Sequence, residues 1–191
     1  MRKLCLADIA DLTAYERERP EFRARVIALK KHRRVPVGDC ITLVFENRDT
    51  ARFQIQEMCR VERIVNPEAI QAEVDVYNTL IPEEGELSAT LLVELDDQQR
   101  VRALLDRLIG VNERVFLETG GRRIQAQFDP GTYREDRVAA VHYIRFRLTP
   151  EAIQAFKAGG REIALVIDHP NYRGRTVLST ETRKALAEDL E

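Results

Sequence analysis

Hydrophobic residues in the first part of the chain recur at the three- and four-residue spacing of amphipathic helices. The expected helices cover residues 6–17, 20–34, 50–65 and 67–78. Pro20 separates the first two, because proline suits the first turn of a helix but lacks the amide proton that a helix interior needs. Asp49 or Thr50 is expected to cap the third helix through a short side-chain oxygen. One strand, over residues 40–46, interrupts this helical region.

The second part of the chain changes to the two-residue alternation of strands. The expected strands cover residues 87–95, 115–117, 124–128, 138–148, 162–168 and 172–178. Gly120 and Gly121 predict a hairpin between the second and third of these, because glycine readily adopts positive φ angles. The segment 162–168 is apolar on both faces, which indicates a central strand. Further helices are expected over residues 96–109 and 150–158 and from Thr180 onward.

Together these elements predict one α+β domain in which helices pack against an antiparallel or mixed β-sheet. No linker-like stretch divides the 191 residues, so the prediction is a single domain over 1–191. Its expected parts are a helical N-terminal segment (1–35), a strand with helices (40–80), a sheet-forming region (87–178) and a terminal helix (180–189). Hydrophobic residues make up 44% and charged residues 32% of the chain, a balance typical of folded rather than disordered proteins.

Charge and cysteine content narrow the class of protein. The 30 basic and 32 acidic residues nearly cancel to a net charge of -2, so no global field attracts nucleic acid or anionic lipid. No apolar run approaches the length of a membrane span, and Asp8 and Asp11 interrupt the region where a secretory signal would be apolar. Cys5, Cys40 and Cys59 have neither disulfide nor zinc-site spacing. We expect a cytoplasmic protein with reduced thiols and no membrane contact; homo-oligomerisation stays open.

The helix expected over 50–65 places a carboxylate among apolar residues. On a helical wheel the polar sector contains Arg52, Gln56, Arg60 and Arg63, and the polar residues within the apolar arc are Gln54, Glu57 and Glu62. A carboxylate buried in that arc needs a cationic partner, a proton or a metal ion. Glu57 therefore has two interpretations: an architectural ion pair with an arginine of the N-terminal helices, or part of a functional site.

Two histidines extend this candidate site. Alternation in the strand 138–148 turns His142 toward the core, where an imidazole either donates to a backbone carbonyl or ligates a metal. His169 follows the central strand, and strand ends commonly carry functional side chains. The predicted polar pocket comprises Gln54, Glu57, His142, Asp168, His169 and Tyr172. Within it, Glu57, His142 and His169 offer ligands for iron or another transition metal, although no spacing motif unites them.

The densest basic cluster lies at the end of the second expected helix. The residues predicted for contact with a partner or an anion are Arg23, Lys30, Lys31, Arg33 and Arg34. The alternative is that these cations complement the partial negative charge of the helix C-terminus. The absence of interleaved aromatic residues argues against base stacking, so nucleic-acid binding is the weaker form of the contact hypothesis.

Motifs of common enzyme classes are missing from the sequence. Neither a helical HExxH nor an ExxH pair is present, which argues against standard zinc hydrolases and di-iron bundles. A GxSxG elbow, a GxGxxG turn after a strand and a phosphate loop are also absent. Whether the chain is an enzyme stays undecided, with a non-enzymatic role favoured.

Five sequence blocks resemble a known family nearly end to end. They are RPEFRARVIALKKHRRVPVG, LVFENRDTARFQIQEMCRVERI, VYNTLIP, VHYIRF and IDHPNY. They resemble the bacterial family known as domain of unknown function 3501, which has no established activity to transfer to particular residues. Its members tend to be encoded beside rubrerythrin-like proteins and iron–sulfur oxidoreductases. The resemblance therefore implies a redox or peroxide-stress setting and partners of these kinds.

Three hypotheses follow. The leading one is a non-enzymatic accessory or binding protein of an iron-containing redox system, which uses residues 23–34 and the helix 50–65. The second is a metal- or haem-binding oxidoreductase-type protein in which Glu57, His142 and His169 line the site. The third is nucleic-acid binding through residues 30–34.

Overall fold

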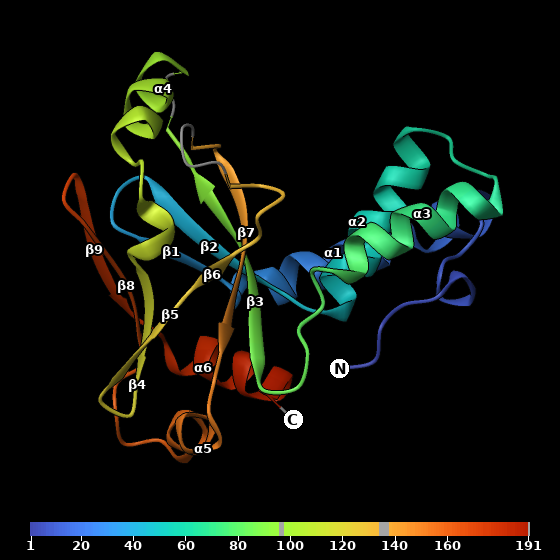
Figure 1. Cartoon of the computed structure of the whole chain (residues 1–191). Coiled ribbons are helices and arrows are strands. Elements are labelled where there is room, and N and C mark those ends of the chain that lie inside the picture. Colours follow the sequence, from blue (N-terminus) through green and yellow to red (C-terminus); the bar gives the residue numbers. More distant parts are fainter. Residues whose placement is uncertain (96–97, 134–137, 191) are drawn as a thin grey trace.

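The computed structural model describes residues 1–95, 98–133 and 138–190, and it contains a β unit beside a helical unit (Figure 1). The helical unit consists of η1 (Leu6–Asp8), α1 (Leu12–Lys31), α2 (Arg48–Val61) and α3 (Pro67–Asn78). The strands are β1 (Arg34–Val37), β2 (Ile41–Glu46), β3 (Glu86–Val93), β4 (Val115–Thr119), β5 (Arg122–Gln125), β6 (Gln127–Phe128), β7 (Val141–Arg147), β8 (Ala164–His169) and β9 (Tyr172–Val177). The other helices are α4 (Gln98–Arg107), η2 (Val111–Glu113), α5 (Pro150–Ala158), α6 (Thr180–Ala187) and η3 (Glu188–Leu190). The predicted α+β class is confirmed.

The strands form two sheets that enclose a common core. Their orders are β1-β2-β3-β7-β6 and β5-β4-β8-β9, and every described pair is antiparallel. Only Ala126 separates β5 from β6, so one extended segment passes from the second sheet to the first. At the opposite edges β9 lies against β1, where the Tyr172 hydroxyl donates to the Val37 carbonyl (2.6 Å) and the Thr176 hydroxyl to the Pro36 carbonyl (2.6 Å). The two sheets therefore approach a closed barrel.

The two-residue alternation of the strands fills this core. On β3 the inward side chains include Leu87, Ala89 and Leu91, which lie opposite residues of β7 and are fully buried. The segment 162–168 forms β8, which lies between β4 and β9 as predicted for a central strand. The predicted glycine turn is also confirmed, because Gly120 and Gly121 have φ angles of 59° and 80° and join β4 to β5.

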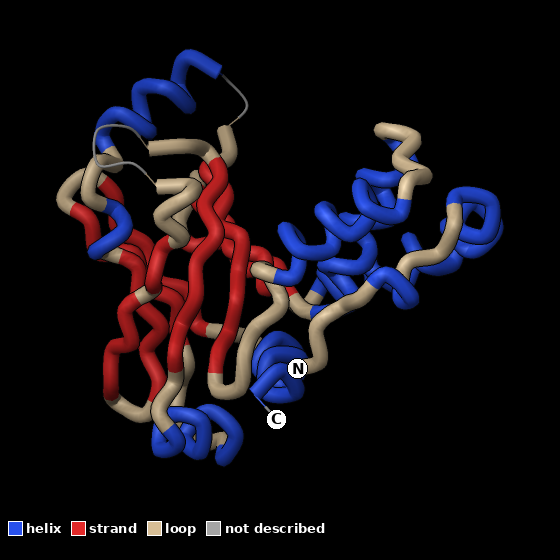
Figure 2. Tube along the Cα trace, turned by 45° about the vertical axis from the view of Figure 1, so that its right-hand side comes forward, coloured by secondary structure: helices blue, strands red, loops and turns tan. Residues whose placement is uncertain are grey.

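The helical unit has apolar clusters of its own, to one side of the sheets (Figure 2). Its α2 and α3 are inserted between β2 and β3, which are neighbours in the sheet. None of the described helices combines the length and the hydrophobicity that a bilayer-spanning segment requires.

The predicted break at Pro20 is wrong, because α1 is one helix with Pro20 in its interior. Buried side chains on both sides of the proline, Tyr15 and Phe22, pack toward α2 and stabilise the continuous helix. Packing of this kind outweighs the hydrogen bond that proline removes. The same prediction extended the helix to residue 34 and so missed strand β1.

The helical wheel of α2 also needs correction. The cap is Asn47, whose side chain accepts from the Thr50 amide (3.0 Å), and the helix ends at Val61 instead of continuing to residue 65. Gln56, placed in the polar sector, is buried and bonds the Ala10 backbone through both amide atoms (2.7 and 3.2 Å). The start of the helix expected over 96–109 lies outside the described residues, and its described part is α4.

Candidate functional site

The three predicted metal ligands are not assembled into one site. Glu57 lies on α2 in the helical unit, whereas His142 and His169 lie on β7 and β8. Across residues 1–95, 98–133 and 138–190, no group of three or more His, Cys, Asp or Glu side chains is arranged to hold a metal ion. The predicted metal site and the six-residue pocket built around it are therefore not formed.

Glu57 has the architectural role. It accepts hydrogen bonds from the Tyr15 hydroxyl (2.8 Å) and from two nitrogens of Arg19 (2.7 and 3.0 Å), and Arg60 adds contacts of 3.4 Å. The Arg19 hydrogen bonds in particular hold the pKa of Glu57 at about 2. The ionised carboxylate thereby ties α2 to α1, which confirms the interpretation as an ion pair with an N-terminal arginine.

His142 faces the core, as the alternation of its strand predicts. The ring is completely buried between Phe128 and Tyr133, with centroid distances of 5.3 and 5.9 Å. In the described part of the chain neither ring nitrogen has a hydrogen-bond partner, although the backbone of Thr132 and Ala139 lies nearby. Burial lowers the pKa of His142, so the ring is neutral at pH 7.

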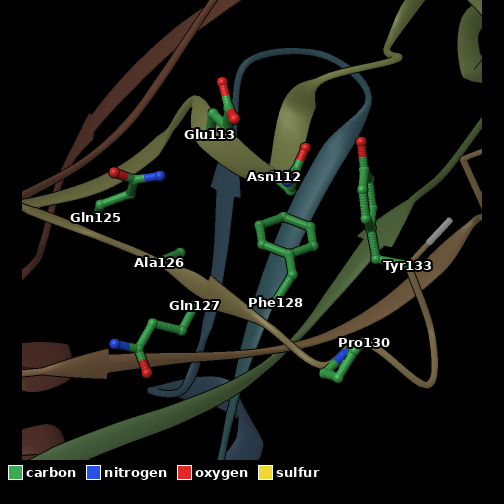
Figure 3. A pocket seen from close by; sticks show the side chains of 8 residues that line it. All are labelled: Asn112, Glu113, Gln125, Ala126, Gln127, Phe128, Pro130 and Tyr133. Atoms are coloured by element: carbon green, nitrogen blue, oxygen red, sulfur yellow. The ribbon is translucent and has the colours of Figure 1, made fainter. Parts of the chain in front are cut away.

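The rings of Phe128 and Tyr133 also line an open surface pocket of about 610 Å³ (Figure 3). The close-up shows Phe128 at its centre, with Asn112 and Glu113 beyond it. Glu113 is the one charged side chain of this lining. The described pocket therefore offers amides and aromatic faces but no convergent set of charged groups.

The polar residues at the end of β8 stabilise turns. The Nδ1 atom of His169 accepts from the Asn171 amide (3.2 Å), so its Nε2 atom donates to the Ile109 carbonyl (3.0 Å). The Tyr172 hydroxyl accepts from the amides of Cys40 and Ile41 (3.1 and 3.2 Å) while it donates to β1. Asp168 lies on the surface near Arg123 and Arg173 (3.3 and 3.7 Å). These side chains are occupied by their neighbours and do not form a pocket.

The predicted basic cluster is divided by burial. Arg33 is only 2% exposed and forms two hydrogen bonds to Asp189 (2.6 and 2.9 Å) and one to the Ala185 carbonyl (2.9 Å). Its prediction as a partner or anion contact is therefore wrong. Arg34 is exposed but pairs with Glu94 (2.6 Å), so the run 30–34 does not present a contiguous basic surface for nucleic acid.

The other three predicted cations lie on α1. Arg23 and Lys31 are exposed, and Lys30 is half-buried. Within the described residues none of the three has a carboxylate within 4.0 Å. These side chains can therefore contact a molecule outside the chain without first breaking an ion pair.

Lys30 lines a cavity of about 290 Å³ between the helical unit and the outer face of the first sheet. The lining residues are Lys30, Arg34, Val44, Glu46, Gln54, Thr90, Leu92, Val141 and Tyr143. Glu46, only 3% exposed, accepts from the Thr90 hydroxyl (2.7 Å) and from the Gln54 amide (3.3 Å). Gln54, a member of the predicted polar pocket, therefore does line a cavity. The acidic residue beside it in that cavity is Glu46, whereas the prediction placed Glu57 there.

Sequence reasoning missed Glu46. Glu46 is the last residue of the strand ITLVFE, whose other five residues are all buried. Its position directly after this apolar run was the feature of the sequence that could have indicated its burial. An acidic residue at the end of a strand is usually exposed, but here Gln54 of α2 and Thr90 of β3 lie against Glu46.

Comparisons with known proteins agree with this architecture. Residues 3–190 match a family described as a protein of unknown function, DUF3501. The chain is also similar to a protein of unknown function from Burkholderia pseudomallei K96243. The two share 36% sequence identity over 100% of both chains, and the TM-score to its crystal structure is 0.92. No curated protein matches the chain.

Proposed function

The chain belongs to the DUF3501 family, and we propose that it is a non-enzymatic accessory or binding protein that docks an acidic protein surface on α1. The observation that carries this proposal is a stripe of three exposed residues, Arg23, Ile27 and Lys31, spaced one helical turn apart. Ile27, the middle residue, is 53% exposed. The two flanking cations have no ion pair in the described part of the chain.

The rest of α1 explains why this stripe faces outward. The opposite side of the helix buries Tyr15, Phe22 and Val26, so the stripe is not needed for packing within the chain. The exposed residues beside Ile27 include Ala24 and Ala28, whose small side chains leave it accessible. An apolar centre with charged flanks is the usual arrangement of a protein-binding surface.

The charges favour an acidic partner. Arg23 and Lys31 would accelerate association with a negatively charged surface, and this effect would weaken as salt is added. The redox setting implied by the family suggests the class of partner. We propose an iron-containing protein, either rubrerythrin-like or an iron–sulfur oxidoreductase.

Affinity purification of the full chain from bacterial cells grown under peroxide stress tests this proposal. The readout is the amount of rubrerythrin-like or iron–sulfur protein that co-purifies, measured for wild type and for Ile27→Glu and Arg23→Glu/Lys31→Glu variants. The matched control is Lys157→Glu, which reverses an exposed lysine on α5. We expect both α1 variants to lose most of the partner and the control to retain it. Equal recovery by all the proteins, or recovery of neither class of partner, would refute the proposal.

A further inference from the structure

We propose that the cavity lined by Glu46 binds a small zwitterion, with the ligand's ammonium group on Glu46 and its carboxylate on Lys30. This site is separate from the docking stripe of α1 and does not depend on it.

The described part of the chain buries three carboxylates, and their partners differ. Glu46, Glu86 and Asp189 are each 3% exposed. Glu86 receives Arg147 (2.6 Å) and Arg145 (3.3 Å), and Asp189 receives the two hydrogen bonds from the buried guanidinium described above.

Glu46 is the exception. Among the described residues its hydrogen-bond partners are the neutral groups of Thr90 and Gln54, with no Lys, Arg or His nitrogen within 4.0 Å. Burial of an ionised carboxylate is costly unless a cation compensates it, and the longer of these two hydrogen bonds, 3.3 Å, is weak. Glu46 is therefore the buried carboxylate that would gain most from a cationic ligand, and it lines a cavity that can admit one.

The wall of this cavity favours a short apolar stem. Val44, Thr90 and Tyr143 are paired across three strands, and Leu92 pairs with Val141 in the adjacent row. Most of these side chains are aliphatic or aromatic, so they suit methylene groups rather than further charges. A volume of about 290 Å³ is at the lower end of the range for ligand sites, which indicates a small molecule rather than a peptide or polymer.

The rim supplies the positive charge. Arg34 is held by Glu94 (2.6 Å), whereas Lys30 has no such partner in the described residues. A ligand with an ammonium group alone would satisfy Glu46 but leave Lys30 unused. A ligand with a carboxylate at its other end satisfies both. In the competing arrangement, the flexible Lys30 side chain turns inward and itself compensates Glu46.

Isothermal titration calorimetry of the full chain distinguishes these arrangements. The zwitterionic probes are β-alanine and γ-aminobutyrate, and the single-charge probes are butylamine and butyrate. We expect a zwitterion to bind more tightly than either single-charge probe. Glu46→Gln should weaken zwitterion binding by about tenfold or more, because the charge-assisted hydrogen bond to the ligand's ammonium group is lost. Lys30→Gln should weaken the zwitterions but leave butylamine unchanged. The control Glu162→Gln alters an exposed carboxylate on the second sheet's side of the molecule and should have no effect.

Three results would overturn the proposal. The first is no binding of any amine-bearing probe at concentrations up to about 10 mM. The second is equal binding by wild type and Glu46→Gln. The third is tighter butylamine binding by Lys30→Gln than by wild type, which would identify Lys30 as the partner of Glu46.

If Glu46→Gln fails to fold by circular dichroism, Val141→Trp provides the second test. Val141 is exposed at the cavity, so a larger side chain there fills the space without touching the buried carboxylate. We expect unchanged folding and lost binding, and retained binding would contradict the assignment.

Discussion

The buried pair between Arg33 and Asp189 leads to the most quantitative prediction. Replacing Arg33 with alanine leaves the Asp189 carboxylate buried without its cation and removes a donor from the Ala185 carbonyl. Breaking a buried ion pair on one side costs about 3–5 kcal/mol. Because domains are stable by only about 5–15 kcal/mol, this change removes a large part of the folding free energy. Urea denaturation should show a midpoint lowered by about 2 M with an unchanged slope.

The neighbouring residue is a matched control. Arg34 and Glu94 also form an ion pair of 2.6 Å, but their side chains are 49% and 45% exposed. Solvent screens such a pair, so Arg34→Ala should cost no more than about 1 kcal/mol. Equal destabilisation by Arg33→Ala and Arg34→Ala would refute this prediction, because the two ion pairs have the same length and differ in burial. A double change of Arg33 to Met and Asp189 to Leu should recover much of the lost stability, since it leaves no charge unpaired.

Three further changes test other contacts by denaturation. Arg19 depresses the pKa of Glu57 from its ordinary 4.5 to about 2. The Glu57 carboxylate therefore stabilises the fold above pH 4.5, and this stabilisation is lost as the pH falls toward 2. Glu57→Gln should lower the free energy of unfolding at pH 7 and reduce its decrease between pH 4.5 and pH 2. Burial depresses the pKa of His142 below its ordinary 6.5, so the stability of the fold decreases as the pH drops below about 6.5. His142→Phe should make the difference in melting temperature between pH 7 and pH 5 smaller. An unchanged difference would exclude His142 as its source. Tyr172→Phe leaves three backbone groups without their partner and should cost about 1–3 kcal/mol, whereas Tyr77→Phe, which loses no described hydroxyl hydrogen bond, should cost less.

Local periodicity was sufficient for much of the fold. It located most strands, the inward direction of His142, the central position of β8 and the glycine hairpin, because each depends on neighbours within a few residues. The sequence also indicated that Glu57 needs a partner, and an arginine of the N-terminal helices, one of the two interpretations, is the partner that the structure shows.

Long-range packing set the limits of the sequence prediction. Arg33 reads as one member of an exposed basic run, and nothing nearby indicates that it is buried against Asp189, 156 positions later. Glu46 and Thr90 are 44 positions apart, so the cavity between them depends on how the helices meet the sheet. Pro20 shows the reverse error, because a strong local rule predicted a break that packing against α2 overrides.

The position of α2 and α3 between adjacent strands bears on how this architecture can vary. Glu46 lies opposite Ser88 in the β2–β3 ladder, so the polypeptide departs from the sheet and rejoins it at nearly the same place. A tight turn could connect β2 directly to β3, and the hydrogen bonds between these two strands would be kept. Removal of α2 and α3 would expose Phe22 of α1, so α1 would have to be lost with them. We therefore expect homologues to contain α1, α2 and α3 together or to lack all three.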